Sequence, residues 1–295
     1  MPRGTVALTG VTGHLGAKVL ARFAGRQASA VLLARNPSKV AGAPGFEVRA
    51  CDYADASGAR RALGGVDTLL MGSAAETPDR VAQHTAFIDA AVSAGVQHLV
   101  YTSFFGAAPD ATFTLARDHW ATEEHIRSTG LPFTFLRDNL YADFLPRMLG
   151  EDGVLRGPAA DGRVSVVAQV DVAAAAVAVL RSPPTYQGRT YDLTGPAAIT
   201  LREAAQIMAD RTGRAVRYEP ETVEQAYASR ASYGAPQWQL DAWVSTYTAI
   251  ANGELAMVSD AIDRLTGRPP LSLATVLSGI GQPGGPTEST GRIRH

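Results

Sequence analysis

Cysteine is nearly absent from this chain, which has one, Cys51, among 295 residues. A single thiol cannot close an intrachain disulfide, and no cluster of cysteine and histidine has the spacing of zinc ligands. The fold should therefore depend neither on oxidation nor on a structural metal. We expect no metal site, and a reducing, cytoplasmic location.

Charge of one sign and long apolar runs are also lacking. The formal net charge is -1, which gives no field that would gather nucleic acid or an anionic membrane. The apolar run 172–180 is far shorter than the roughly 20 residues that span a bilayer. Residues 1–4 lead directly into an apolar run, so we expect no signal peptide. A small molecule is the expected partner, and the oligomeric state is left open.

Short apolar runs alternate with longer segments of helical period, which predicts a parallel sheet with helices on both faces. The expected strands are 5–8, 30–34, 46–50, 68–71, 99–103 and 133–136, and the expected helices are 17–23, 54–63, 79–94 and 115–128. The fold class is therefore α/β, a Rossmann-type doubly wound sheet. It should occupy residues 1–150, with further contributions from about 164–195.

The remainder of the chain predicts a smaller, mostly helical C-terminal lobe for the substrate, over residues 196–280. A glycine- and proline-rich loop, 150–162, precedes a strand at 164–167 and a helix at 171–180 capped by Asp171. Thr200 and Glu203 fit a capping box. The tail, 281–295, should be flexible.

The most informative motif follows the first strand. Glycines spaced by three let the backbone turn off a strand, approach a diphosphate closely and pack the start of a helix against the sheet. Helix amides without internal partners then face the phosphates. We expect the cofactor to contact Gly10, Val11, Thr12, Gly13, His14, Leu15 and Gly16. The alternative is a purely structural turn, because turns collect glycine.

Arg35 stands after the second strand, where NAD-binding versions of the fold have a carboxylate. A guanidinium there pairs with a 2′-phosphate, so NADPH is the expected cofactor. Asp52, beside Tyr53, is expected to accept a hydrogen bond from adenine or to cap a helix. Small residues end the fourth strand where backbone should lie against a ribose: Gly72, Ser73 and Ala74.

These motifs resemble the NmrA-like atypical short-chain dehydrogenase/reductases, the group that contains quinone and triphenylmethane reductases. The resemblance is carried by residues 9–16, 34–37, 101–103, 119–123, 136–141 and 265–270. From the first of these motifs to the last, it extends over about nine-tenths of the chain. It implies a nicotinamide near Ser73, Ser103 and the Asn139–Tyr141 turn, with cofactor contacts from Thr102, Asn139, Leu140 and Tyr141. It also implies a substrate cleft between the sheet and the C-terminal lobe.

The usual proton donor of that superfamily is missing. If Glu123 matches the acidic residue that follows the family's lysine, His119 stands at the lysine position and Leu115 at the tyrosine position. Leucine cannot donate a proton, although a quinone accepts hydride without a fixed acid. We expect His119 to orient the substrate or supply a proton, or to form only a surface pair with Glu123. Ser103 is expected to hydrogen-bond the carbonyl oxygen.

The expected function is an NADPH-dependent oxidoreductase that transfers hydride to a quinone or polycyclic aromatic carbonyl. One alternative is a ketoreductase that tailors an aromatic polyketide with substrate-assisted protonation. A second is a non-catalytic NADP-binding redox sensor, because fold alone does not separate enzymes from regulators. An apolar floor for a flat substrate is expected from Phe104, Phe105, Trp238 and Trp243.

Overall fold

A computed structural model describes residues 4–24, 30–40 and 45–279. In this part of the chain, the largest sheet has seven parallel strands in the order β3-β2-β1-β4-β5-β6-β9. Their bounds are β1 Val6–Leu8, β2 Ala30–Ala34, β3 Glu47–Ala50, β4 Thr68–Met71, β5 His98–Phe104, β6 Phe133–Asp138 and β9 Arg189–Leu193. Strands β1, β2 and β4 are almost entirely apolar, as expected for inner strands whose two faces are covered by helices. The predicted doubly wound fold is confirmed.

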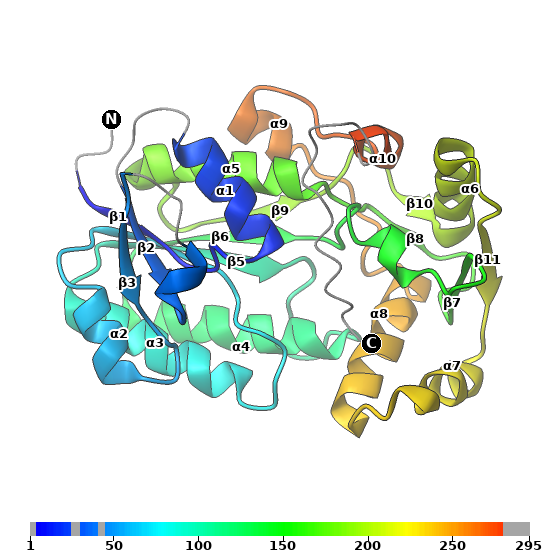
Figure 1. Cartoon of the computed structure of the whole chain (residues 1–295), viewed down its shortest axis with the longest axis horizontal. Coiled ribbons are helices and arrows are strands. Elements are labelled where there is room, and N and C mark those ends of the chain that lie inside the picture. Colours follow the sequence, from blue (N-terminus) through cyan, green and yellow to red (C-terminus); the bar gives the residue numbers. More distant parts are fainter. Residues whose placement is uncertain (1–3, 25–29, 41–44, 280–295) are drawn as a thin grey trace.

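Figure 1 shows the two helical layers, with α1, α5 and α9 on one face of the sheet and α2, α3 and α4 on the other. The bounds are α1 His14–Ala24, α2 Ala56–Ala62, α3 Arg80–Ala94, α4 Thr114–Thr129, α5 Gln169–Arg181 and α9 Ala261–Thr266, with the short 3-10 helix η1 at Pro37–Val40. The strand order reverses between β1 and β4. Ligands of such sheets bind at the carboxyl ends beside this reversal.

A second group of elements packs around its own apolar cluster, to the right in Figure 1. It contains β7 Val154–Gly157, β8 Arg163–Val164, β10 Ile199–Thr200, α6 Leu201–Thr212, β11 Arg217–Pro220, α7 Val223–Arg230, α8 Gln237–Ala251 and α10 Leu273–Gly279. β7 pairs with β11 in parallel and β8 with β10 antiparallel. Three further 3-10 helices are η2 Leu145–Met148, η3 Pro183–Tyr186 and η4 Ala231–Tyr233.

Several expected boundaries need correction. The loop 150–162 contains β7, and β8 ends at Val164. α5 is capped by Ala168, so the prediction that Asp171 caps it was wrong. Asp171 is fully buried, and its carboxylate accepts hydrogen bonds from Arg268 Nη2 at 2.5 Å and the Leu271 amide at 2.7 Å. The segment after α9 is thereby fixed to α5, and α9 itself lies outside the C-terminal lobe.

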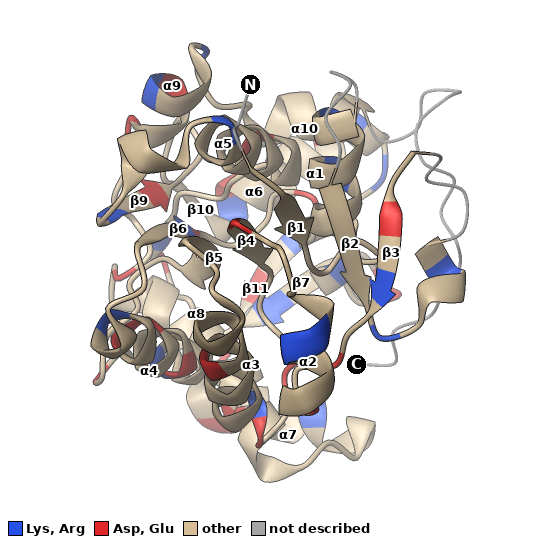
Figure 2. Cartoon of the chain, turned by 90° about the vertical axis from the view of Figure 1, so that its left-hand side faces the viewer, with Lys and Arg blue, Asp and Glu red and all other residues tan. Residues whose placement is uncertain are grey.

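The capping box of Thr200 and Glu203 is present in full. The expected tail, 281–295, lies outside the described residues. Within them, no helix is both long and apolar enough to cross a membrane. Figure 2 shows a basic and an acidic segment next to each other on β3 and on α9, so neither sign is gathered on these two elements.

Candidate functional site

The turn between β1 and α1 has the geometry that its glycines predict. Gly10 has a φ of +67°, and its carbonyl accepts the Gly13 amide at 2.9 Å. A Cβ on Gly16 would lie 2.1 Å from the Gly10 carbonyl oxygen. α1 therefore begins in direct contact with the turn, and its first amides face the carboxyl edge of the sheet without helical partners. This arrangement can hold a diphosphate.

Side chains tie the neighbouring strand ends together. The Gly72 amide donates to Thr9 Oγ1 and the Tyr53 hydroxyl donates to the Gly72 carbonyl, each at 2.8 Å. Tyr53 also stacks on Phe87, with ring centroids 4.0 Å apart. The hydroxyl of Tyr53 is thus used inside the protein, which argues against a direct contact with adenine. Its role here is to fix the ends of β1, β3 and β4.

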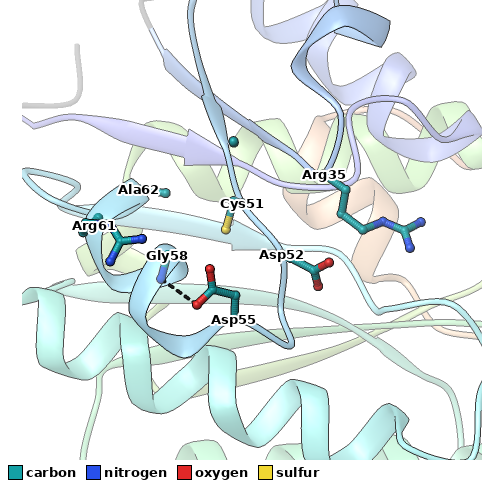
Figure 3. A pocket seen from close by; sticks show the side chains of 8 residues that line it. Arg35, Cys51, Asp52, Asp55, Gly58, Arg61 and Ala62 are labelled. Atoms are coloured by element: carbon teal, nitrogen blue, oxygen red, sulfur yellow. Dashed lines mark hydrogen bonds between the residues drawn. The ribbon is translucent and has the colours of Figure 1, made fainter.

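A cavity of about 460 Å³ opens beside the ends of β2 and β3. Its lining is charged or small: Arg35, Ala50, Cys51, Asp52, Asp55, Gly58, Arg61 and Ala62. Figure 3 shows the side chains of Arg35 and Asp52 extending to the same side of this opening. Burial raises the pKa of the Cys51 thiol to about 12, so it stays neutral. A phosphorylated adenosine fits this combination of a free guanidinium and a carboxylate.

The alternative role for Asp52, a helix cap, was wrong. The N-cap of α2 is Asp55, whose carboxylate accepts the Gly58 amide at 3.0 Å. Asp52 accepts the amide of Ala54 instead, also at 3.0 Å, and its side chain is exposed at the cavity. Its predicted contact with adenine stays open.

Hydrogen bonds to buried side chains hold the loop after β4. The Ser73 amide donates to Thr102 Oγ1 at 3.3 Å, and the Ala74 amide donates to His84 Nε2 at 2.8 Å. His84 then donates from Nδ1 to Thr122 Oγ1 at 2.9 Å. Sequence reasoning missed His84, because a lone histidine on an apolar helix carries no local signal. The result is an exposed Ser73 on a fixed backbone.

His119 is buried, and its ring nitrogens both have partners. Arg80 donates from Nη2 to Nε2 at 2.9 Å, so the neutral ring carries its proton on Nδ1, which donates to the Tyr101 hydroxyl at 2.9 Å. Burial, and next the charge of Arg80, lowers the pKa of His119 well below its ordinary value. These contacts argue against all three expected roles of His119, namely orienting a substrate, supplying a proton and pairing with Glu123.

Glu123 is completely buried and binds other residues. It accepts from Ser103 Oγ at 2.6 Å, from Arg137 through Nε at 2.8 Å and Nη2 at 2.6 Å, and from Arg127 at 3.2 Å. Ser103 is also fully buried, so its hydroxyl does not reach a substrate in this arrangement. The expected contact of Ser103 with a carbonyl oxygen is replaced by this network, which joins α4 to β5 and β6.

The turn after β6 is rigid. Asn139 donates to Ser165 Oγ at 2.9 Å and to the Leu255 carbonyl at 3.0 Å, while its own oxygen accepts the Leu140 amide. The Tyr141 hydroxyl donates to Asp138 Oδ2 at 2.5 Å. Burial raises the pKa of Asp138 to about 7, against this hydrogen bond and the charge of Arg80. The structure thus places a titratable carboxyl beside the expected nicotinamide position.

Asp138 makes folding stability depend on pH. Its pKa rises from 3.8 to about 7 on folding, so its contribution is present in full at low pH and is lost as the pH rises through 7. Asp138→Asn keeps an acceptor for Tyr141 but does not titrate. Relative to wild type, the variant should gain roughly 2 to 3 kcal/mol between about pH 5 and about pH 8 in urea unfolding. An unchanged difference would contradict this expectation.

The four expected substrate aromatics do not form one surface. Phe104 and Phe105 are buried in the lobe's apolar cluster, where Phe104 contacts Phe113 at a centroid distance of 4.8 Å. Trp238 and Trp243 are half-buried on α8, and Trp243 lies edge-on to Tyr233. Because they are five residues apart, they project from the helix about 140° from each other. Any floor for a flat substrate would therefore use only one of the two tryptophans.

The sheet reversal, the glycine turn at β1 and the arginine-lined cavity together define a Rossmann-type dinucleotide-binding protein. Comparison with known proteins adds the family. The model of the NmrA-like family matches residues 2–237, and the chain belongs to this family.

Three relatives are similar over nearly their whole length. Quinone oxidoreductase 2 of Escherichia coli K12 is 33% identical, covering 92% of this chain and 97% of the relative, and its NADPH complex superposes with a TM-score of 0.83. NAD(P)H azoreductase of Xenophilus azovorans is 30% identical, covering 91% and 95%. Citrobacter sp. triphenylmethane reductase, solved with NADP(H), is 32% identical, covering 92% and 98%, with a TM-score of 0.82.

Proposed function

We propose that this chain is an NADPH-dependent reductase that transfers hydride to a quinone or a similar flat aromatic acceptor. The glycine turn supports its cofactor binding most directly, because the positive φ of Gly10 and the close contact at Gly16 bring the start of α1 against the turn, as a diphosphate site requires. The relatives that bind NADPH or NADP(H) keep this fold at about a third identity. Their names include quinone, azo and triphenylmethane reductases.

The chain's own residues bind and orient. The amides at the start of α1 hold the diphosphate, and Arg35 pairs with the 2′-phosphate at the cavity beside β2. Ser73 and the Asn139–Tyr141 turn frame the nicotinamide end. Ser73 is fixed by its hydrogen bond to Thr102, and the turn by the hydrogen bond from Asn139 to Leu255. When bound, the reduced nicotinamide supplies the hydride.

A fixed proton donor is not required. Leu115 is buried and has no proton that it can donate, and the Nδ1 proton of His119 is already donated to Tyr101. A quinone that accepts hydride becomes a delocalised phenolate-type anion, which takes its proton from water. This explains why an acceptor of that type suits the site better than a simple ketone.

An acceptor screen tests this function. Purified protein is mixed with NADPH or NADH and a benzoquinone, a naphthoquinone, an azo dye, a triphenylmethane dye, a polyketide-like aromatic ketone or a simple ketone, and nicotinamide absorbance is followed. We expect turnover with quinones and dyes and a preference for NADPH. Reduction confined to polyketide-like ketones would favour the ketoreductase alternative. Tight NADPH binding without turnover of any acceptor would favour the redox sensor.

Arg35 should determine the cofactor preference. Arg35→Ala removes a charge-assisted hydrogen bond to the 2′-phosphate, so we expect the Kd for NADPH to rise about 10- to 100-fold. The Kd for NADH, which lacks this phosphate, should change little. Arg61→Ala is the matched control, because Arg61 lines the same cavity from α2. Equal losses for both nucleotides in Arg35→Ala would contradict the assignment.

A further inference from the structure

The segment after β6 is anchored on two sides. The Ala142 amide donates to the Val167 carbonyl, and the Val167 amide donates to the Leu140 carbonyl, both at 2.9 Å. Asp143 Oδ2 accepts the amide of Gln169, the first residue of α5, at 2.8 Å. Residues 140–143 are therefore fixed against the main domain, and they position η2, which follows directly.

Two side chains, one from this segment and one from η2, contact residues near the start of α1. Asp143 Oδ1 lies 3.9 Å from Lys18 Nζ, and Arg147 Nη1 lies 3.3 Å from His14 Nε2. His14 is the first residue of α1 and follows Gly13 of the turn. Arg147, on η2, is therefore placed beside the turn that receives the diphosphate.

The surroundings of Arg147 lack a compensating charge. Its recorded partner is an imidazole, and within the described residues no carboxylate lies at ion-pair distance. Arg264, by contrast, has such a partner in Asp260 at 3.1 Å. A helix N-terminus also disfavours a cation and favours an anion. A guanidinium at this place is therefore available to pair with an anion bound at the start of α1.

We propose that Arg147 binds the diphosphate of the dinucleotide from the η2 side, opposite the amides of the Gly10–Gly16 turn. This inference rests on the proposed function, which supplies the diphosphate. A guanidinium presents several donors in one plane and can engage two phosphate oxygens at once. Arg35 and Arg147 then have separate tasks, because Arg35 reads the 2′-phosphate and Arg147 binds a group that NADPH and NADH share.

The test compares Arg147→Ala with Arg147→Lys, using NADPH, NADH and adenosine 2′-phosphate as probes in titration calorimetry. We expect Arg147→Ala to raise the Kd for NADPH and for NADH by a similar factor of about 10 or more. Arg147→Lys should recover part of this loss. Adenosine 2′-phosphate has no diphosphate, so its Kd should not change. Arg264→Ala, which removes an exposed arginine of α9, is the matched control.

The outcomes separate this inference from the proposed function. If wild type binds NADPH and Arg147→Ala binds it equally well, the assignment of Arg147 is overturned. A loss limited to NADPH and adenosine 2′-phosphate would also overturn it, since Arg147 would then read the 2′-phosphate. If wild type binds neither dinucleotide, the proposed function itself fails. Because Arg147 is exposed, the thermal midpoint of each variant should match wild type and confirm the fold.

Discussion

Replacing Gly16 with alanine should strongly weaken dinucleotide binding. The added Cβ would lie 2.1 Å from the Gly10 carbonyl oxygen and 2.9 Å from the Val11 nitrogen. Both are backbone atoms of the turn, so α1 must move away from the sheet edge and take its amide donors with it. We expect the Kd for NADPH to rise at least about 100-fold, which is roughly 2.7 kcal/mol, measured by titration calorimetry.

The matched control is Gly13→Ala in the same turn. Its Cβ would lie 3.3 Å from the same carbonyl oxygen, a tight contact that a small shift relieves. Gly13→Ala should therefore weaken binding less than Gly16→Ala. Equal losses for the two variants, or full binding by Gly16→Ala, would show that contact at Gly16 does not shape the phosphate site. Circular dichroism at matched temperature checks that both variants stay folded.

Removing the Glu123 carboxylate should cost the most stability. Glu123 is fully buried between Ser103 of β5, Arg137 of β6 and Arg127 of α4. Glu123→Gln leaves the Arg137 guanidinium, whose side chain is 17% exposed, without its counter-charge. Breaking a buried ion pair on one side typically costs about 3 to 5 kcal/mol. Urea unfolding at neutral pH measures the loss.

Glu124→Gln is the neighbouring control. The Glu124 side chain is 49% exposed and pairs with Arg127, so its loss should cost less than about 1 kcal/mol. Replacing Glu123 and Arg137 together by methionine should recover part of the stability, because neither member of this ion pair is then left without the other. Similar losses in Glu123→Gln and Glu124→Gln would mean that the buried network contributes little.

Local patterns predicted the main domain well where the strands are apolar. The expected strands at 30–34 and 68–71 match β2 and β4 residue for residue, because an inner parallel strand is an uninterrupted apolar run. β9 was missed, since an edge strand of sequence Arg-Thr-Tyr-Asp-Leu has no such run. β7 was hidden for a related reason, within a stretch dominated by turn residues.

In the candidate site, too, some features were predictable from the sequence and others were not. The geometry of the glycine turn and the place of Arg35 at the end of β2 were predictable because they depend on neighbours within a few residues. The partners of His119 and Glu123 were not, since Arg80 comes from α3 and Arg137 from β6. Spacing of one helical turn suggested that His119 and Glu123 pair with each other, but tertiary packing supplied each of them with a different arginine.

The chain crosses repeatedly between the sheet and the C-terminal lobe: it enters with β7, returns with α5, leaves after β9, comes back with α9 and departs again with α10. The chain thus passes between the two parts five times. Because of these connections, the two parts should unfold together as one cooperative unit. Truncating the chain before α9 would leave the buried carboxylate of Asp171 without Arg268, and would destabilise α5, a helix distant from the cut in the sequence.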